Sequence, residues 1–191
     1  SISFNMLFLE EIWSRNFTNL FIAPLKVSEI ITALTATALI RTLIGIVPAI
    51  LLASPFFNVS IFTLGPTLIL LLLSLYLFGM TLGLFVVSGL LRYGPAFENV
   101  AWSSLFLLAP LGCIYYPLSI LPDWLQILAK TLPLVYIFEE VRSILINNVV
   151  NYSNIMTAFI LNLIYFTIAI ITFYKSFSEA RNRGSLINVG E

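Results

Sequence analysis

Four long apolar runs restrict this chain more than any other feature of its sequence. An α-helix needs about 20 apolar residues to cross the hydrocarbon layer of a membrane. Four runs reach that length: 30–53, 61–91, 100–121 and 155–174. Arg41 alone interrupts the first run with a charge, and Pro110 and Pro117 break the third. We therefore predict an all-α polytopic membrane protein with four complete transmembrane helices.

The composition excludes several other classes of protein. Of the 191 residues, 60% are hydrophobic and 9% are charged, whereas soluble domains carry about 25% charged residues. Nine basic and nine acidic residues cancel, so no net charge attracts the chain to nucleic acid. Histidine, the commonest metal ligand, is absent, and Cys113 is the single cysteine, which excludes an internal disulfide and a multi-cysteine metal site. We expect no metal site.

The segments outside the runs differ in polarity. Residues 1–9 are apolar but too short to cross a membrane. They resemble the end of an earlier span whose beginning is absent, or alternatively the apolar region of a signal peptide. The polar or mixed segments are 10–29, 54–60, 92–98, 122–154 and 175–191.

Basic residues near the ends of the runs set the predicted orientation, because Lys and Arg are retained preferentially in the cytoplasm. One side of the membrane would carry Arg15, Lys26, Arg92, Lys175, Arg181 and Arg183. The other side would carry only Lys130 and Arg142. The segments 10–29, 92–98 and 175–191 are therefore predicted to be cytoplasmic, and 54–60 and 122–154 to face outward.

The first polar segment has the pattern of a short amphipathic helix. Trp13, Phe17, Leu20 and Phe21 recur at spacings of four and three, which places them on one helical face. Pro24 then ends the helix. Such a helix either lies in the membrane surface or docks a cytoplasmic partner. Periodicity is compatible with both.

Arg41 is the one charged residue inside a run. Eleven residues of helix from Ile30 place it about 16 Å deep, where arginine side chains usually face protein or a water-filled cavity. It would meet an anionic group of a substrate or pair with a carboxylate or carbonyl. Tyr76, Tyr115 and Tyr116 are further candidates for a substrate path, on which they would stack on sugar rings, although membrane anchoring and packing are alternative roles.

Two stretches resemble the permeases of type-2 ABC exporters. In "NLFIAPLKVSEII" (19–31), the residues that carry the resemblance are Ala23, Pro24, Leu25 and Glu29. In "YYPLSILPDWLQILAKTLPLVYIFEEVRSIL" (115–145), they are Pro117, Leu121, Pro122, Trp124, Leu125, Pro133, Leu134 and Arg142. The order and spacing agree over nearly the whole chain. Family members usually have six spans, so an N-terminal part is expected to be missing, and "RNFTN" stands where many carry Glu-x-Gly-Thr.

The resemblance implies a transport subunit that is not itself an enzyme. Such permeases pair with a second copy, identical or different, and bind ATP-hydrolysing subunits that hold ATP and Mg, so this chain would bind no cofactor. In this sequence no glycine is followed by lysine, as a Walker loop would require. The segment 10–29 would be a cytoplasmic coupling helix that docks the ATP-binding subunit through Trp13, Arg15, Phe17, Leu20, Phe21 and Pro24. Export would proceed across the plasma membrane, which is the inner membrane in a Gram-negative cell.

The outer segment 122–154 has two interpretations. Its prolines predict short helices that break and turn back while packed against protein. This re-entrant segment would form an outer gate with Pro117, Pro122, Trp124, Pro133 and Arg142, or alternatively an interfacial loop that stiffens the dimer. The charges of Asp123, Glu139, Glu140 and Arg142 would line an exit or be solvated.

Two other functions are weaker alternatives. A membrane enzyme acting on lipids would need clustered acids, histidines or a nucleophile, and Arg92 and Glu98 are too sparse. A channel or secondary transporter without an ATPase would be expected to show inverted repeats or several intramembrane charges, and the sequence offers Arg41 alone.

The predicted orientation can be tested with introduced cysteines. Cysteines at Asn58 and Asn148 should react with an impermeant thiol reagent added from outside, because both segments are predicted to face outward. A cysteine at Arg181 should not react in intact cells. Protection at Asn148 together with labelling at Arg181 would invert the orientation.

Overall fold

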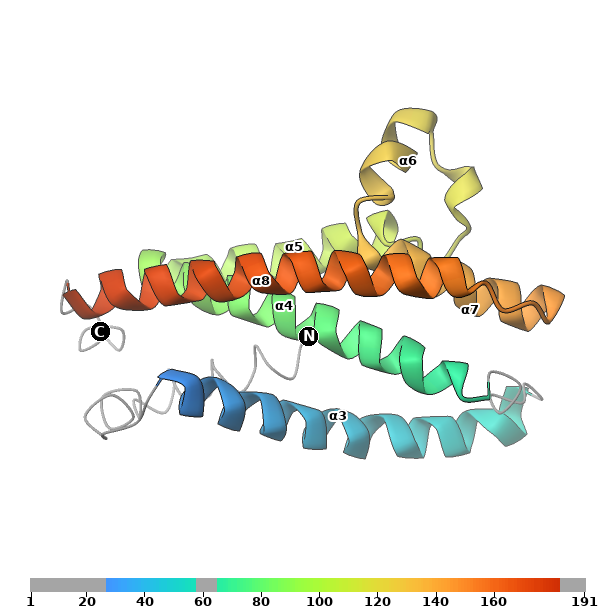
Figure 1. Ribbon diagram of the computed structural model, residues 1–191, viewed down its shortest axis with the longest axis horizontal. Coiled ribbons are helices and arrows are strands. Elements are labelled where there is room, and N and C mark those ends of the chain that lie inside the picture. The colour runs from blue at the N-terminus through green and yellow to red at the C-terminus, as the bar shows by residue number, and fades with distance from the viewer. Residues whose placement is uncertain (1–26, 58–64, 183–191) are drawn as a thin grey trace. The chain divides into compact units, whose positions relative to one another are not determined.

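The computed structural model describes residues 27–57 and 65–182, and the regular structure within these ranges is entirely helical. The elements follow one another along the chain as shown in Figure 1. They are α3 (Val27–Phe57), α4 (Thr67–Tyr93), η2 (Pro95–Phe97), α5 (Glu98–Leu111), η3 (Leu118–Ile120), α6 (Asp123–Ala129), α7 (Pro133–Asn147) and α8 (Tyr152–Asn182).

The described residues fall into two compact units, and several long helices contribute to both. The first unit comprises residues 27–48, 79–101 and 167–182. The second comprises residues 49–57, 65–78 and 102–166. The second unit therefore contains the whole outer segment predicted from the sequence, together with the beginnings of α4 and α8.

Glycine and proline set the ends of α4. Gly65 has a φ of 52° and is followed by Pro66, which precedes the first helical residue. At the other end Gly94 has a φ of 75°, and its N–H donates to Leu90 O over 2.9 Å. A left-handed residue after the last turn satisfies a backbone carbonyl that would otherwise lack a donor, and glycine adopts this conformation at no steric cost.

Small and hydroxylated side chains are among the buried residues of α4 and α8. On α4 the buried hydroxyls recur at every seventh position, at Thr67, Ser74, Thr81 and Ser88. The buried residues of α8 are Ile155, Ala158, Asn162, Ala169, Phe173, Ser176 and Ala180. Spacings of three, four and seven define one helical seam, and small residues on such a seam let helix backbones approach closely in a membrane.

In the second unit α4 and α8 run side by side in the same direction. Leu71 of α4 packs with Ile155 and Ala158 of α8. One turn further along, Ser74 is hydrogen-bonded by Asn162. Residue numbers therefore rise together along both helices, which is the relative direction that the predicted topology gives these two spans.

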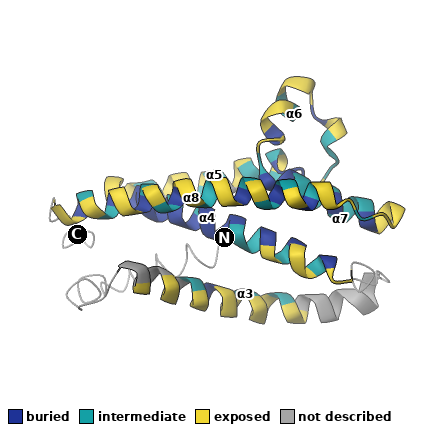
Figure 2. Cartoon of the chain, viewed as in Figure 1, coloured by how far each residue is buried: buried dark blue, intermediate teal, exposed yellow. Residues whose placement is uncertain are grey.

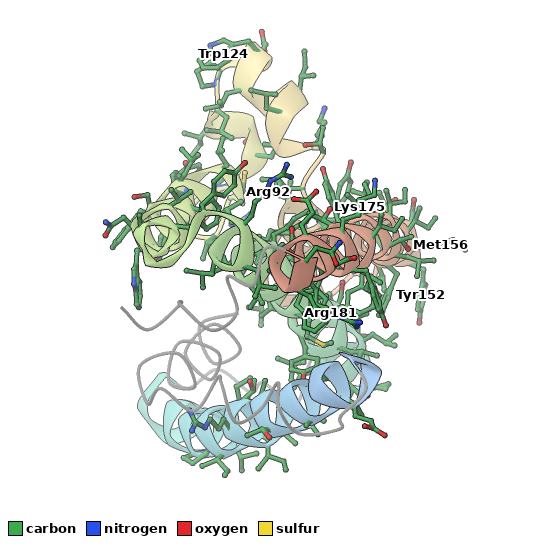
Figure 3. The ribbon with its side chains drawn as sticks, turned by 90° about the vertical axis from the view of Figure 1, so that its left-hand side faces the viewer. Arg92, Trp124, Tyr152, Met156, Lys175 and Arg181 are labelled. Atoms are coloured by element: carbon green, nitrogen blue, oxygen red, sulfur yellow. The ribbon has the colours of Figure 1, made fainter. Side chains whose placement is uncertain are left out.

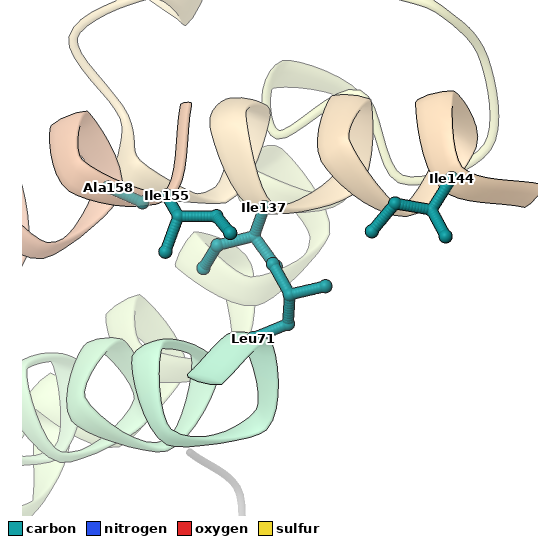
Figure 4. Close-up of a cluster of buried hydrophobic side chains, with 5 residues drawn as sticks. All are labelled: Leu71, Ile137, Ile144, Ile155 and Ala158. Carbon is teal, nitrogen blue, oxygen red and sulfur yellow. The ribbon is translucent and has the colours of Figure 1, made fainter. Parts of the chain in front are cut away.

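A hydrophobic cluster joins the outer segment to these helices within the second unit. Ile137 and Ile144 of α7 pack against Leu71, Ile155 and Ala158, as Figure 4 shows. The two α7 residues are seven positions apart, so they lie on the same face of the helix. The remaining buried residues of α7 include Pro133, Leu134 and Val135.

The run 100–121 is not one continuous helix, unlike the span predicted from its apolar character. Helix α5 ends at Leu111, and turns follow until η3. Gly112 donates to Leu108 O over 2.8 Å, and Cys113 follows with a φ of 53°. A Cβ on Gly112 would lie 2.9 Å from both Leu108 O and Leu134 Cδ1, so the close approach requires glycine here.

Two of the helices are long and apolar enough to cross a membrane by length and composition, namely α4 and α8. They contain most of the predicted span 61–91 and all of 155–174. The predicted span 30–53 lies within α3, whose shorter apolar part is residues 35–48. Figure 2 shows mostly exposed residues along the described part of α3, among them Ile40, Leu43 and Ile44. An exposed apolar surface of this kind suits a lipid or protein environment better than water.

Within the first unit, a polar contact joins the ends of α4 and α8, and aromatic packing joins α4 to η2. Arg92 Nε lies 3.7 Å from Glu179 Oε2. The rings of Tyr93 and Phe97 stack with their centroids 5.8 Å apart. Gly89 is buried against Phe97, and a Cβ at this glycine would overlap the Phe97 ring.

This contact predicts a specific effect of substitution at Gly89. Gly89→Ala should lower the free energy of unfolding by about 1–3 kcal/mol, as expected for overpacking. Adding Phe97→Ala should recover part of that loss, because the overlapping ring is removed. Thermal unfolding in detergent measures both effects.

Gly45→Ala is the matched control, since nothing lies within 4 Å of the added Cβ. It should leave stability unchanged or raise it by up to about 1 kcal/mol through helix propensity. Equal melting temperatures for the Gly89 and Gly45 variants would show that the Gly89–Phe97 contact is not tight.

Candidate functional site

The outer segment is organised around three charged residues of α7: Glu139, Glu140 and Arg142. Helix α7 begins with Pro133, whose fixed φ and missing N–H suit the first turn of a helix. It ends at the left-handed Asn148, whose N–H donates to Ile144 O over 3.0 Å. The three charged residues lie between these two ends, near both the turns that follow α5 and the start of α8.

Arg142 binds the backbone left unpaired where α5 ends. Its Nη2 donates to Cys113 O and, over 3.4 Å, to Ile114 O. The last carbonyls of a helix have no partner within the helix, and a buried carbonyl without a donor is unfavourable. The guanidinium supplies donors to two carbonyls in the turns that follow α5.

Glu139 completes this arrangement by binding both Arg142 and the chain beyond it. Arg142 Nη1 donates to Glu139 Oε1 over 2.7 Å. The same oxygen accepts the N–H of Leu118 over 2.8 Å. Both charged side chains are half-buried. We call this set of contacts the α7 clamp: Arg142 and Glu139 together fix the backbone of 113–118 onto α7.

Glu140 forms a second polar connection, to the beginning of α8. Its side chain is fully buried. Oε1 accepts the N–H of Asn151 over 2.7 Å, and Oε2 accepts Asn154 Nδ2 over 3.1 Å. A carboxyl group at this place lies at the positive end of the α8 dipole and satisfies a backbone N–H that the helix itself leaves unpaired. One α7 side chain thus fixes where α8 begins.

Apolar packing supports the clamp from the side of α6. Cys113, Leu121, Ala129 and Val135 form a buried cluster. Gln126 of α6 donates to Leu121 O over 2.8 Å. In Figure 1 α6 and its flanking turns extend away from α7, and this cluster is their attachment to it.

The residues predicted to form an outer gate all lie in this part of the second unit. Pro117 precedes η3, Pro122 precedes α6 and Pro133 begins α7. Trp124, on α6, is 66% exposed and is labelled in Figure 3. The structure thus places the three prolines at helix starts and turns of one packed segment and Arg142 within α7, and their part in gating stays a prediction.

The candidates for a substrate path are distributed over three elements. Arg41 lies on an exposed part of α3, and Tyr76 is half-buried on α4. Tyr115 is 80% exposed in the turns that follow α5. Tyr116 Oη donates to Pro110 O over 2.8 Å, so this tyrosine has a structural contact. A path along these residues stays a prediction.

The predicted docking residues lie outside the described residues. They are Trp13, Arg15, Phe17, Leu20, Phe21 and Pro24. Helix α3 begins at Val27, inside the segment 10–29 that was predicted to couple to a partner.

Sequence reasoning missed the partners of the α7 charges. Glu139, Glu140 and Arg142 were weighed as exit-lining or solvated, and the structure shows all three hydrogen-bonded to backbone or side chains. Asp123 is exposed. A signal was available, since three charges occur within four residues of a stretch whose other positions are mostly apolar. The hydrogen bond from Asn162 to Ser74 was also missed, although Asn162 is the one asparagine within the run 155–174.

The described residues hold no group of three or more His, Cys, Asp and Glu side chains placed to bind a metal ion. The polar contacts above serve to satisfy backbone groups and to join helices. Such an arrangement shapes and holds a helical segment.

A model of the ABC-2 type transporter family matches residues 1–146. The chain belongs to the ABC-2 type transporter family. Comparison with curated proteins and with solved structures gives no match. The matched range includes the segment 10–29 and the outer segment as far as α7.

Membership of the ABC-2 family assigns the chain to the membrane part of an ABC-type transporter, a transport component and not a catalytic one. It also places the apolar helices in a membrane. The resemblance seen in residues 19–31 and 115–145 is therefore confirmed at the level of the family.

The α7 clamp predicts the effect of removing Arg142. Arg142→Ala should lower the free energy of unfolding by about 2 kcal/mol or more, because hydrogen bonds to a charged group are lost and two carbonyls are left without donors. Arg142→Lys should recover only part of this, since one ammonium group cannot reproduce the planar fork of donors. Thermal unfolding and proteolysis of the purified protein measure these effects.

Lys130→Ala is the matched control, because it removes a positive charge from an exposed position of the same segment. It should change stability by less than about 0.5 kcal/mol. If Arg142→Ala and Lys130→Ala are equally stable and equally resistant to protease, the clamp does not hold the segment.

Proposed function

We propose that the chain is the membrane-spanning permease subunit of an exporter that is driven by ATP hydrolysis on a partner subunit. The observation that carries this proposal is the ABC-2 family match over residues 1–146. The two helices of sufficient length and the outer segment built on α7 support it. The protein would lie in the plasma membrane and cross it several times.

The energy source is proposed to be a separate ATP-binding subunit that holds ATP and Mg. No glycine in the sequence is followed by lysine, so this chain contains no phosphate-binding loop of the Walker type. The permease would pair with a second copy, identical or different, and each would receive its own ATP-binding subunit.

Coupling is proposed to occur through the helix at residues 10–22. Its aromatic face would dock the ATP-binding subunit, and its acidic start, Glu10 and Glu11, suits a helix N-terminus but is unfavourable beside an anionic leaflet. Pro24 separates it from α3, which runs without a break from Val27 to Phe57. A displacement of the docking helix would move α3 as a lever.

Arg41 is the residue of α3 that we propose to sense a substrate. It is an exposed cation fourteen residues after Val27, about 21 Å along the helix axis. An anionic group of the substrate would match its charge. Tyr76, Tyr115 and Tyr116 would continue the path, and the outer segment with Pro117, Pro122, Trp124, Pro133 and Arg142 would gate its exit.

The docking helix can be tested by placing a charge on its aromatic face. Phe17→Asp should weaken binding of the ATP-binding subunit and uncouple ATP hydrolysis from transport, while membrane insertion is unchanged. A buried interface anchor typically contributes 2 kcal/mol or more, so a loss of affinity of about 30-fold is expected. Co-purification of the ATP-binding subunit and ATP hydrolysis in proteoliposomes measure the two effects.

Asn19→Asp provides the matched control, because it adds the same charge to the opposite face of the same helix. It should retain the partner subunit. Wild-type affinity and transport in Phe17→Asp would reject the docking role of this helix. Failure of any ATP-hydrolysing subunit to co-purify with the wild-type chain would reject the proposed function itself.

A further inference from the structure

The amide of Asn162 is buried in α8 with only one of its two ends paired. Its Nδ2 donates to Ser74 O over 2.9 Å and to Ser74 Oγ over 2.8 Å. Its Oδ1 is buried and accepts no hydrogen bond within the described part of the chain. The side chain as a whole has 0% exposure.

The orientation of this amide is fixed by its partner. Ser74 O can only accept a hydrogen bond, so the amide nitrogen must face it. The carbonyl oxygen is therefore the end left without a donor. In hydrocarbon no bulk water is present to supply one, and an unpaired carbonyl there is unfavourable.

Asn162 also lines an open groove in the surface of the second unit, with a volume of about 320 Å³. The other lining side chains are all apolar: Leu77, Met156, Phe159, Ile160, Leu163 and Phe166. This volume is at the lower end of the range for small-molecule sites. Met156 and Leu163 are 67% and 68% exposed, and Met156 projects outward from α8 in Figure 3. The groove is therefore accessible from the side of α8.

We propose that this groove binds an aliphatic chain that carries one hydrogen-bond donor, of the chemical class of a long-chain alcohol, entering sideways from the hydrocarbon layer. The apolar walls fit the chain. Because Asn162 Oδ1 is buried, the hydroxyl would pair with it by displacing the wall side chain that covers it. Asn162 lies ten residues after Tyr152, about 15 Å along the helix. A hydroxyl at that depth needs a protein acceptor, which gives the groove its selectivity for a donor-bearing chain. The site rests on membrane location alone and is independent of ATP-driven export.

The test compares two photoactivatable probes, a diazirine-bearing dodecanol and its methyl ether, on the full chain in phosphatidylcholine nanodiscs. The two probes share the same chain, and only the alcohol can donate. At equal mole fraction in the membrane, the alcohol should label residues 156–166 about three- to tenfold more than the ether, as expected for one hydrogen bond within a membrane. Equal labelling by the two probes would overturn the proposal and show that the groove takes ordinary acyl chains.

Variants separate the roles of the acceptor and of the groove. Asn162→Leu should lower alcohol labelling to the level of the ether. Leu163→Trp changes an exposed position and should fill the groove, so both probes lose labelling at 156–166. The Leu163→Trp variant tests whether the probes bind in the groove even if Asn162→Leu does not fold. Ile171→Trp, at an exposed position of α8 in the first unit, should label as the wild type. Unchanged labelling in Leu163→Trp would also overturn the proposal.

Discussion

The pairing of polar groups inside an apolar chain is the constraint on which the outer segment depends. A membrane supplies no water for backbone groups that a helix leaves unpaired. Where α5 stops at Leu111, the chain exposes carbonyls and N–H groups that need partners within the protein. The α7 clamp provides them, since Arg142 donates to Cys113 O and Ile114 O and Glu139 accepts from Leu118. Glu140 does the same for the start of α8. Three side chains of one helix thus fix both segments that flank it.

This arrangement has a consequence for transport. Because the turns after α5, the cluster beside α6 and the beginning of α8 are all joined to α7, the outer segment should move as a single packed body. An exporter needs an exit that opens without exposing unpaired backbone to lipid. Movement of a segment whose polar groups are satisfied internally meets that requirement, whereas unfolding of the turns would not. The proposed gating role therefore rests on the integrity of these hydrogen bonds.

The sequence predicted those features that depend on local pattern. Uninterrupted apolar runs predicted α4 and α8, and proline positions indicated the helix starts at Pro122 and Pro133. The family resemblance in residues 19–31 and 115–145 was confirmed.

Features that depend on distant partners were not predictable in the same way. Pro110 and Pro117 indicated that the apolar run 100–121 is broken, but not that the turns after Leu111 are held by Arg142, 29 residues after Cys113. Likewise the charged residues of α7 and Asn162 could be identified in the sequence, but their hydrogen-bond partners depend on tertiary packing. The docking residues from Trp13 to Pro24 lie outside the described residues, so their role stays a prediction.

Amide hydrogen exchange at Leu118 and Asn151, in the protein reconstituted in a membrane, tests whether α7 holds the two segments that flank it. Both N–H groups lie outside regular α-helix and donate to α7 carboxyl groups, over 2.8 Å and 2.7 Å. We predict that both exchange as slowly as amides in the interior of α7, because opening either one requires the packed segment to separate. Exchange of these two amides at the rate of an exposed loop, while α7 itself stays protected, would contradict it.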